Sequence, residues 1–423
     1  MRIKKPRIHY IILFFLMILD LEFLNLVDIA RFNILGMYYS DIIFVVSILI
    51  FIAELFCSGF RIKIDASLAV IFSFLMIACF SAKSAQLSYN QSFLAGMAAQ
   101  REWLSWILLI YPIYSWIKNK KITVEGIQKC MRYVCRGYAM ICILQFFLYN
   151  FVNFTYVMTN SRYGNVRLYF NTAYFSIMIC IIIDELFNKN ITRKQKVIDL
   201  IEFAAYFFVI AVITKGRMAT IALVASMAIF FSVRKNISVN KKLLVILCAI
   251  VGVVIFTYST MGKDILNTIT GVSSQTDTLG VRDAARSYYI DKTFSSTRTL
   301  FLGYGVPNIH NQTAMTISNP LWQSMGDARF YLNDVGLVGI FFQYGILGIS
   351  LLVGLTFFML KKFSSIYKKQ GKTQYVQYLV LDIITWASLT PTLFSTSILG
   401  VILLTIAFIE KNYSTSIKNK DML

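Results

Sequence analysis

The chain has 423 residues, of which 57% are hydrophobic and 15% are charged, and its formal net charge is +20. Soluble domains are about 45–50% apolar, so this composition excludes an ordinary soluble fold. The basic residues stand in short clusters between apolar runs, which is how membrane proteins set their orientation, so we expect no nucleic-acid partner.

The apolar runs are long enough to cross a bilayer as helices. A crossing needs about 20 mostly apolar residues, and runs near this length occur about twelve times. They start near Tyr10, Asp41, Ala66, Trp103, Tyr133, Thr172, Ile198, Met218, Leu243, Val335, Val376 and Leu393. We therefore predict an all-α polytopic membrane protein of about 12 transmembrane helices.

Charge predicts the orientation of these spans. Connections rich in Lys and Arg, such as 118–121 and 193–196, alternate with connections that contain few basic residues. Basic connections stay in the cytoplasm, so both termini are expected there. The alternation requires a tight outer turn at Lys215-Gly216-Arg217. A second short turn is predicted at Pro391, between the last two spans.

One polar segment is far longer than the other connections. It covers residues 259–333, between the ninth and tenth predicted spans, and lies outside in this topology. The predicted organisation is spans 1–9 in residues 1–258, a large extracytoplasmic loop in 259–333, and spans 10–12 with a cytoplasmic tail in 334–423. Ordered segments longer than about 12–15 residues are usually functional, so this loop argues for chemistry at the outer surface.

The predicted outer face collects fixed cations that suit a polyanion. The planar guanidinium of arginine binds phosphate oxygens in pairs and keeps its charge, so a pyrophosphate-bearing lipid is a sensible ligand. The expected pyrophosphate-binding residues are Arg162, Arg167, Lys215, Arg217, Arg282, Arg286 and Arg329. The alternative is that single members of this set solvate a loop or contact lipid headgroups. For Arg217 a helix N-terminus adds to the attraction for anions.

Three stretches resemble one family. They are Thr214-Lys-Gly-Arg-Met-Ala-Thr220, the stretch from Arg282 through Arg286 to Leu300-Phe-Leu-Gly-Tyr-Gly-Val-Pro-Asn308, and Asp334-Val-Gly-Leu-Val-Gly-Ile-Phe-Phe-Gln-Tyr-Gly-Ile-Leu-Gly348. In order and placement they resemble the bacterial Wzy-type O-antigen polymerases and their O-antigen ligase relatives. The ligases carry a His-Asn-like pair shortly before the third stretch. Here that place reads Asp327-Ala-Arg-Phe-Tyr-Leu-Asn333, and His310-Asn311 stands earlier, which favours the polymerases.

The resemblance implies a metal-independent, GT-C-like membrane glycosyltransferase with no cofactor. Its substrate would be an undecaprenyl-pyrophosphate-linked oligosaccharide at the outer face of the bacterial cytoplasmic (inner) membrane. Such an enzyme builds O-antigen, capsule or exopolysaccharide by joining repeat units. Membrane lipid, a chain-length regulator and a flippase are the further partners that the resemblance implies.

Three residues are candidates for the base that activates the acceptor hydroxyl: His310, Asp327 and Asp334. The titration range of histidine suits proton transfer, although a loop histidine is often incidental. Asp334 has a second interpretation as the cap of the helix that follows it.

Carboxylates inside the apolar runs keep other functions open. These are Asp20, Glu22, Glu54, Glu102, Glu202 and Asp382. Ionisable groups in hydrocarbon usually face a partner or a cavity, so they either pair structurally, with Arg101 and Arg136 among the cations, or mark a proton-coupled transporter. A lipid-linked oligosaccharide flippase is the alternative to a polymerase from another class, and an O-antigen ligase is the alternative nearest in mechanism.

Overall fold

The computed structural model of the chain describes residues 8–21, 39–59, 66–152, 157, 159–162, 165–168, 170–187, 191–233, 278–322, 328–395 and 397–410. Within these ranges the chain is mostly helical, with two small antiparallel sheets. The predicted ninth span near Leu243 and the beginning of the predicted loop at Ser259 lie outside the described residues.

The first half of the fold is a succession of helices with one hairpin. Its elements are α1 (Ile8–Asp20), α2 (Tyr39–Cys57), α3 (Ala66–Tyr89), α4 (Phe93–Ala98), α5 (Arg101–Leu108), α6 (Ile110–Lys118), α7 (Val124–Val152), β1 (Thr159–Arg162), β2 (Asn165–Leu168), α8 (Ala173–Leu186), α9 (Arg193–Phe208), the π-helix η3 (Val209–Ile213) and α10 (Arg217–Val233). In the hairpin, Asn160 of β1 pairs with Arg167 of β2.

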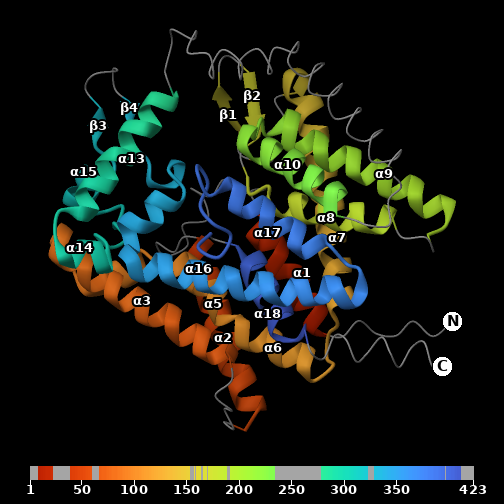
Figure 1. Cartoon of the computed structure of the whole chain (residues 1–423), viewed down its shortest axis with the longest axis horizontal. Coiled ribbons are helices and arrows are strands. Elements are labelled where there is room, and N and C mark those ends of the chain that lie inside the picture. The colour runs from red at the N-terminus through yellow and green to blue at the C-terminus, as the bar shows by residue number, and fades with distance from the viewer. Residues whose placement is uncertain are drawn as a thin grey trace.

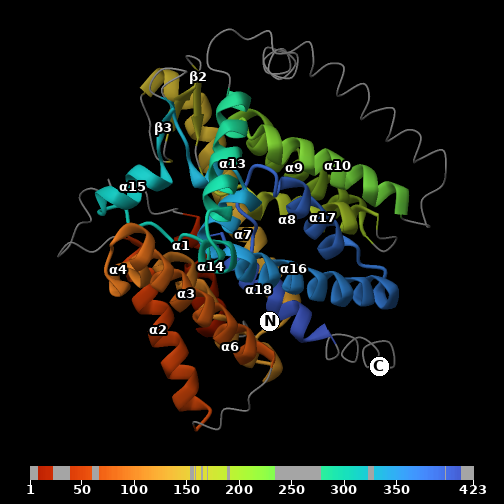
Figure 2. The same cartoon turned by 60° about the vertical axis from the view of Figure 1, so that its left-hand side comes forward.

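The second half is built around a long helix that is kinked at Gly345, whose φ and ψ are not helical. Its elements are α13 (Thr278–Phe294), α14 (Thr297–Leu302), α15 (Gln312–Ser318), β3 (Leu321–Trp322), β4 (Ala328–Arg329), the 3-10 helix η4 (Leu332–Asp334), α16 (Leu337–Gln370), α17 (Gln374–Thr385) and α18 (Ile398–Phe408). In the small sheet, Leu321 of β3 pairs with Arg329 of β4. Figures 1 and 2 both show α13, α14 and α15 gathered at one end of α16.

Two of the described helices, α3 and α16, are long and apolar enough to cross a membrane. Both carry large apolar side chains on their outer faces: Phe72 of α3 is 61% exposed and Phe357 of α16 is 69% exposed. Contact with lipid explains such exposure, which is costly in water. The count of about twelve spans and the cytoplasmic placement of both termini stay predictions.

The run that starts near Trp103 is not one continuous helix. Helix α5 ends at Leu108 and α6 begins at Ile110. Pro112 explains the break, because its ring nitrogen cannot donate to the carbonyl four residues earlier, at Leu108, and the ring crowds that carbonyl. The predicted fourth span is therefore two short helices.

The predicted break at Lys215 is confirmed as a turn. The π-helix η3 ends at Ile213, and Lys215 adopts a positive φ of 50°. The N–H of Gly216 donates to the carbonyl of Ile210 (3.2 Å), and α10 starts directly afterwards at Arg217. Which side of the membrane this turn faces stays a prediction.

The connection between α17 and α18 differs from the prediction. A short turn at Pro391 is wrong, because residues 386–397 separate the two helices. The carboxylate of Asp382, near the end of α17, accepts hydrogen bonds from the backbone N–H (3.0 Å) and hydroxyl (2.5 Å) of Thr392 and from Nε1 of Trp386 (3.1 Å). The side chain of Asp382 thereby organises an irregular segment where a tight turn was expected.

A second buried carboxylate holds the other end of this segment. Oδ2 of Asp20, at the end of α1, accepts from the N–H of Ile398 (3.2 Å), the hydroxyl of Ser397 (3.0 Å) and the phenol of Tyr174 (2.5 Å). The start of α18 is thus fixed by a residue from the far end of the chain. Buried charged groups need such partners to offset their lost hydration.

The described part of the predicted loop is a folded helical unit. Helix α13 presents Ala285 and Tyr289 to a buried apolar cluster that also contains Phe330, Val335 and Phe342. Because Phe342 belongs to α16, this cluster fastens the unit to the first half of the long helix.

We call the segments 214–220, 282–308 and 334–348, which carry the family resemblance, the recognised stretches. Glycines allow the second and third of them to make direct backbone contact. Gly303 (φ 72°) and Gly345 (φ 61°) both occupy the left-handed region that favours glycine. A Cβ on Gly303 would lie 2.5 Å from the carbonyl carbon of Gln343, and a Cβ on Gly345 would lie 2.5 Å from that of Phe301. We call the contact of residues 301–305 with 342–345 the glycine junction.

The glycine junction is closed by backbone hydrogen bonds and by α3. The N–H of Tyr304 donates to the carbonyl of Phe342 (2.7 Å), and its ring stacks on the Phe342 ring at 4.8 Å. On the other side a Cβ at Gly305 would lie 2.4 Å from the carbonyl oxygen of Ser81. Nη1 of Arg298 also donates to the hydroxyl of Ser84 in α3 (2.8 Å), so this arginine is part of the packing.

Candidate functional site

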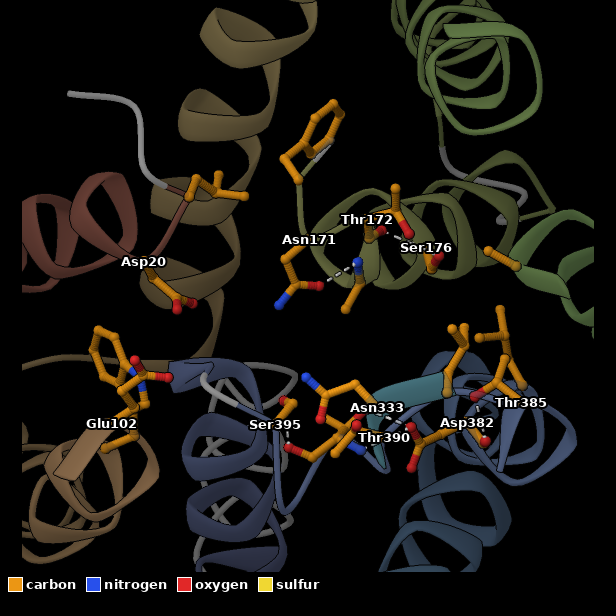
Figure 3. Close-up of a pocket in the computed structure, with 18 of the residues that line it drawn as sticks. Asp20, Glu102, Asn171, Thr172, Ser176, Asn333, Asp382, Thr385, Thr390 and Ser395 are labelled. Carbon is orange, nitrogen blue, oxygen red and sulfur yellow. Dashed lines mark hydrogen bonds between the residues drawn. The ribbon is translucent and has the colours of Figure 1, made fainter. Parts of the chain in front are cut away.

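A polar cavity of about 570 Å³ opens between helix ends from both halves of the chain. Figure 3 shows its lining. Its volume falls in the range of about 300–1,000 Å³ that small-ligand sites occupy. The polar residues that line it are Asp20, Glu102, Ser105, Asn171, Thr172, Ser176, Asn333, Asp334, Tyr378, Asp382, Thr385, Thr390, Thr392 and Ser395.

Helix α8 begins at the cavity, so the residues at its start contribute polar groups to the cavity wall. Oδ1 of Asn171 accepts from the N–H of Ala173 (3.0 Å), and the hydroxyl of Ser176 donates to the carbonyl of Thr172 (3.2 Å). The amide nitrogen of Asn171 forms no hydrogen bond recorded between described residues. This helix start therefore offers the cavity a side-chain donor.

Two of the four carboxylates in the lining serve the fold. Asp20 is 8% exposed and Asp382 is 6% exposed. Asp382 accepts three hydrogen bonds from the 386–397 connection, and Asp20 accepts three that join the end of this connection and the start of α18 to Tyr174 of α8. Figure 3 shows Asp20 on one side of the cavity and Asp382 on the other.

The other two carboxylates, Glu102 and Asp334, are exposed to the cavity. No hydrogen bond or ion pair to either carboxylate is recorded among the described residues. Asp334 does not cap α16, because the N-cap residue is Gly336 and no side chain caps the helix. The Asp334 carboxylate therefore makes no N-cap hydrogen bond to that helix.

Two of the recognised stretches meet at this cavity. Ala219, in the first stretch, lines it two positions after Arg217, and Asp334 begins the third stretch. The second stretch instead forms the glycine junction, away from the lining. The side chains of Arg162 and Arg217, and the whole of Asp327, lie outside what the structure describes.

Residues 203–353 match the family model described as O-antigen ligase. The match contains all three recognised stretches and supports the O-antigen ligase and polymerase superfamily. Members of this superfamily are membrane proteins that transfer glycosyl groups. No curated protein and no solved structure matches the chain.

Among the cations predicted to bind pyrophosphate, Arg286 contacts the connection that contributes Leu389, Thr390, Thr392 and Ser395 to the lining. Its Nη2 donates to the carbonyl of Ala387 (2.8 Å), in the 386–397 connection, and its Nη1 pairs with Asp283 (2.5 Å). These two bonds use two of the five N–H groups of the guanidinium, so the other three are not used by them. Lys215 stands at the turn before α10, four residues ahead of the lining residue Ala219.

The remaining predicted cations lie farther along their elements. Arg282 is half-buried on α13, one turn before Arg286, and Arg329 is exposed on β4. Arg167 is half-buried in β2, three residues before the lining residue Phe170. None of these three lines the cavity.

The structure also separates His310 from the cavity. This histidine is exposed in the loop between α14 and α15, where its N–H donates to Oδ1 of Asn308 (2.9 Å). Nδ2 of Asn308 donates to the carbonyl of Ala95 (3.2 Å) and so anchors this loop to α4. His310 is not among the lining residues.

The carboxylates predicted inside apolar runs divide into paired groups and one exception. Glu202 pairs with Arg132 (2.6 Å) and with Arg136, and Glu54 accepts from Ser115 (2.5 Å). The expected pairing role of Arg136 is therefore confirmed, whereas Glu22 lies outside the described residues. Glu102 is the exception, because it faces the cavity without a recorded partner in the described chain.

Sequence reasoning left Glu102 out of the candidate site. Its neighbour Arg101 made an ion pair the simpler interpretation, but Nη1 of Arg101 donates to the carbonyl of Ala98 (2.8 Å). Nothing in the local sequence distinguishes Glu102 from Glu54 or Glu202, because only the packing of distant helices creates the cavity.

Tyr289, next to η4 in the apolar cluster, is a hydrogen-bond donor and not a base. Burial raises the pKa of its phenol, and the nearby Tyr288 and Asp334 raise this pKa further. The neutral phenol donates to the carbonyl of Ser318 (2.5 Å) and holds the end of α15.

Proposed function

We propose that the chain is a polysaccharide polymerase that transfers a glycan from an undecaprenyl-pyrophosphate carrier to the acceptor sugar of another lipid-linked repeat unit. The reaction takes place at the outer face of the bacterial cytoplasmic membrane and serves O-antigen, capsule or exopolysaccharide synthesis. One observation carries the proposal: the first and third stretches of the O-antigen ligase match contribute to the same polar cavity.

The chemistry needs a base and a stabilised leaving group. The acceptor hydroxyl oxygen forms a bond with the anomeric carbon of the donor, and the bond from that carbon to the pyrophosphate oxygen breaks. The hydroxyl proton passes to a carboxylate, and the electron pair leaves with the pyrophosphate. Fixed cations lower the barrier by stabilising the charge that develops on this group, so no metal is required.

Asp334 is the residue to which we assign the base. It lines the cavity, is exposed to it, and has no recorded hydrogen bond or ion pair among the described residues. Asp20 and Asp382 are less suited, since each already accepts three hydrogen bonds. A carboxylate fixed within hydrogen-bond reach of the acceptor can take its proton.

The cations assigned to the leaving pyrophosphate are Lys215, Arg217 and Arg286. The first two stand at the N-terminus of α10, whose backbone N–H groups and dipole also attract anions. Arg286 donates to the carbonyl of Ala387 (2.8 Å), two residues before the lining residue Leu389. In this arrangement the donor's pyrophosphate lies outside the cavity, and the anomeric carbon attached to it faces the acceptor sugar in the cavity.

An O-antigen ligase is the second candidate, favoured by the description of the matching family model. A ligase would use the same donor but transfer the glycan to a different acceptor, a finished lipid-linked core. A flippase is the alternative from another class, since it would move the lipid-linked oligosaccharide without breaking a bond.

The deciding experiment reconstitutes the purified chain in liposomes with EDTA. The substrate is the lipid-linked repeat unit extracted from source cells that lack the protein. A ladder of longer glycans, lost in Arg217→Ala and reduced in Arg286→Ala, supports the polymerase. Transfer to a lipid A core acceptor without a ladder supports the ligase. Movement of the lipid without either product supports the flippase and overturns the proposal.

A further inference from the structure

We infer that the cavity is the acceptor-sugar subsite, and that Glu102 makes it select neutral or amino sugars over sugars that carry a carboxylate. This inference rests on the proposed function, because the acceptor has meaning only in a glycosyl transfer. It adds a substrate class and a specificity-determining residue that the three recognised stretches do not contain.

The charge of the lining carries the first step. Its ionisable acidic residues are Asp20, Glu102, Asp334 and Asp382, and no Lys, Arg or His of the described chain lines the cavity. A concave site with carboxylates alone concentrates negative potential, which attracts cations and repels anions. A uronic acid placed here would bring a further carboxylate, and no cation among the described lining residues would meet it.

The neutral groups carry the second step. Asn333 and Thr390 lie together in the view of Figure 3, across from Asn171. Amides and hydroxyls both donate and accept hydrogen bonds, as sugar hydroxyls do. With Ser105 and Ser395 also in the lining, the cavity offers many such groups for its volume. This chemistry suits a sugar ring better than it suits an apolar ligand.

The same lining argues against pyrophosphate in the cavity itself. Pyrophosphate would stand beside Glu102 and Asp334, whose like charges disfavour it. The candidate cations instead belong to the turn at Lys215 and to Arg286, outside the lining. The separation of the candidate cations from the carboxylates of the lining assigns the donor's pyrophosphate to a place outside the cavity and leaves the cavity to a neutral or cationic acceptor sugar.

Contacts of the neighbouring residues hold the backbone of Glu102 in place, so its carboxylate can discriminate between substrates by charge. It lies in the first turn of α5, and Gln100, two residues earlier, donates from Nε2 to the carbonyl of Ala78 in α3 (3.0 Å). The next residue, Trp103, packs its ring 5.6 Å from that of Phe74. Figure 3 shows Glu102 on the same side of the cavity as Asp20.

The test compares three monosaccharides that differ in charge. Glucosamine, glucose and glucuronate are titrated at pH 7 into the full chain in lipid nanodiscs, and binding is followed by saturation-transfer NMR. We expect the affinity order glucosamine, glucose, glucuronate. Glu102→Gln should reduce the advantage of glucosamine over glucuronate about two- to five-fold, the change expected for one solvent-accessible ion pair.

Two controls separate charge at the cavity from charge elsewhere. Glu102→Asp keeps the carboxylate and should preserve the order. Glu125→Gln removes an exposed glutamate of α7 that does not line the cavity, and it should leave all three affinities unchanged. An equal change in Glu125→Gln would assign the effect to the overall charge of the protein and overturn the inference.

The liposome assay keeps this inference distinct from the proposed function. If the ladder forms but wild type binds glucuronate as well as glucosamine, the proposed function stands and the acceptor-sugar inference is overturned. If the charge order depends on Glu102 but no glycan is transferred, the cavity selects sugars by charge and the proposed polymerase is overturned.

Discussion

The glycine junction and the cavity use residues of the recognised stretches in opposite ways. At the junction, Gly303 and Gly345 bring two backbones into contact, leaving no space for a side chain. At the cavity, Ala219 of the first stretch and Asp334 of the third stretch line an open, polar space. A sequence resemblance therefore mixes residues that pack the protein with residues that face a cavity, and only the structure distinguishes the two.

The sharpest test of this division is Asp334→Asn. Loss of the assigned base should lower glycan transfer about 10²- to 10⁴-fold, the usual contribution of general base catalysis. Stability should stay unchanged, because no described residue bonds to this carboxylate. The measurement is the rate of ladder formation together with the thermal unfolding temperature.

Asp291→Asn is the matched control for this change. Asp291 is an exposed residue of α13 outside the cavity lining, so its substitution should leave the rate unchanged. If Asp334→Asn unfolds the protein, or keeps full activity, the assignment of the base to the cavity is wrong.

At the junction, Gly345→Ala should cost stability. The new Cβ would meet the backbone of Phe301 at a positive φ, and such strain and overpacking cost about 2–4 kcal/mol. Thermal unfolding in detergent measures the loss. Gly354→Ala lies in the same helix with open space around its Cβ, so it should be neutral or slightly stabilising. Equal effects of the two changes would show that the contact at Gly345 is not tight.

The 386–397 connection lies between these extremes, because it is both packed and part of the cavity wall. Asp382→Asn places an amide donor against Thr392 or Trp386, and an unsatisfied buried donor costs about 1–3 kcal/mol. Thr392→Val removes the partner hydroxyl, and the double variant should lose less stability than the sum of both. Strict additivity would contradict the bond between these side chains.

The smallest effect is expected at His310→Ala. An exposed loop residue outside the lining should change stability by no more than about 0.5 kcal/mol, and transfer by about two-fold at most. A hundred-fold loss would instead place the base at His310 and move the candidate site to the loop between α14 and α15.

Helices could be predicted from the apolar runs because a run of consecutive apolar residues is visible in the sequence without knowledge of distant contacts. The turn at Lys215 followed from charge alternation, and the structure contains it. The connection after α17 could not be predicted in this way. It depends on the buried carboxylates of Asp20 and Asp382. Asp20 bonds to Ile398, which is distant in sequence, and nothing in the sequence marks Thr392 as the partner of Asp382.

The candidate site was predictable to a smaller extent. Asp334 came from the resemblance, and its role as a cap was excluded only by the position of Gly336. His310 looked suitable by chemistry, yet Asn308 anchors its loop to α4. Glu102 was overlooked as a site residue because its exposure to the cavity results from the packing of α5 between other elements.

The π-helical turn η3 has a consequence for how this protein tolerates changes in chain length. A π-turn accommodates an extra residue relative to an α-helix, as in the bond from the N–H of Thr214 to the carbonyl of Val209 (2.9 Å). Deleting one residue from 209–213 would replace the π-turn with an α-turn and shorten the chain that carries Lys215 to the start of α10. Hydrophobicity and net charge would hardly change. The placement of this cation therefore depends on the number of residues in the turn.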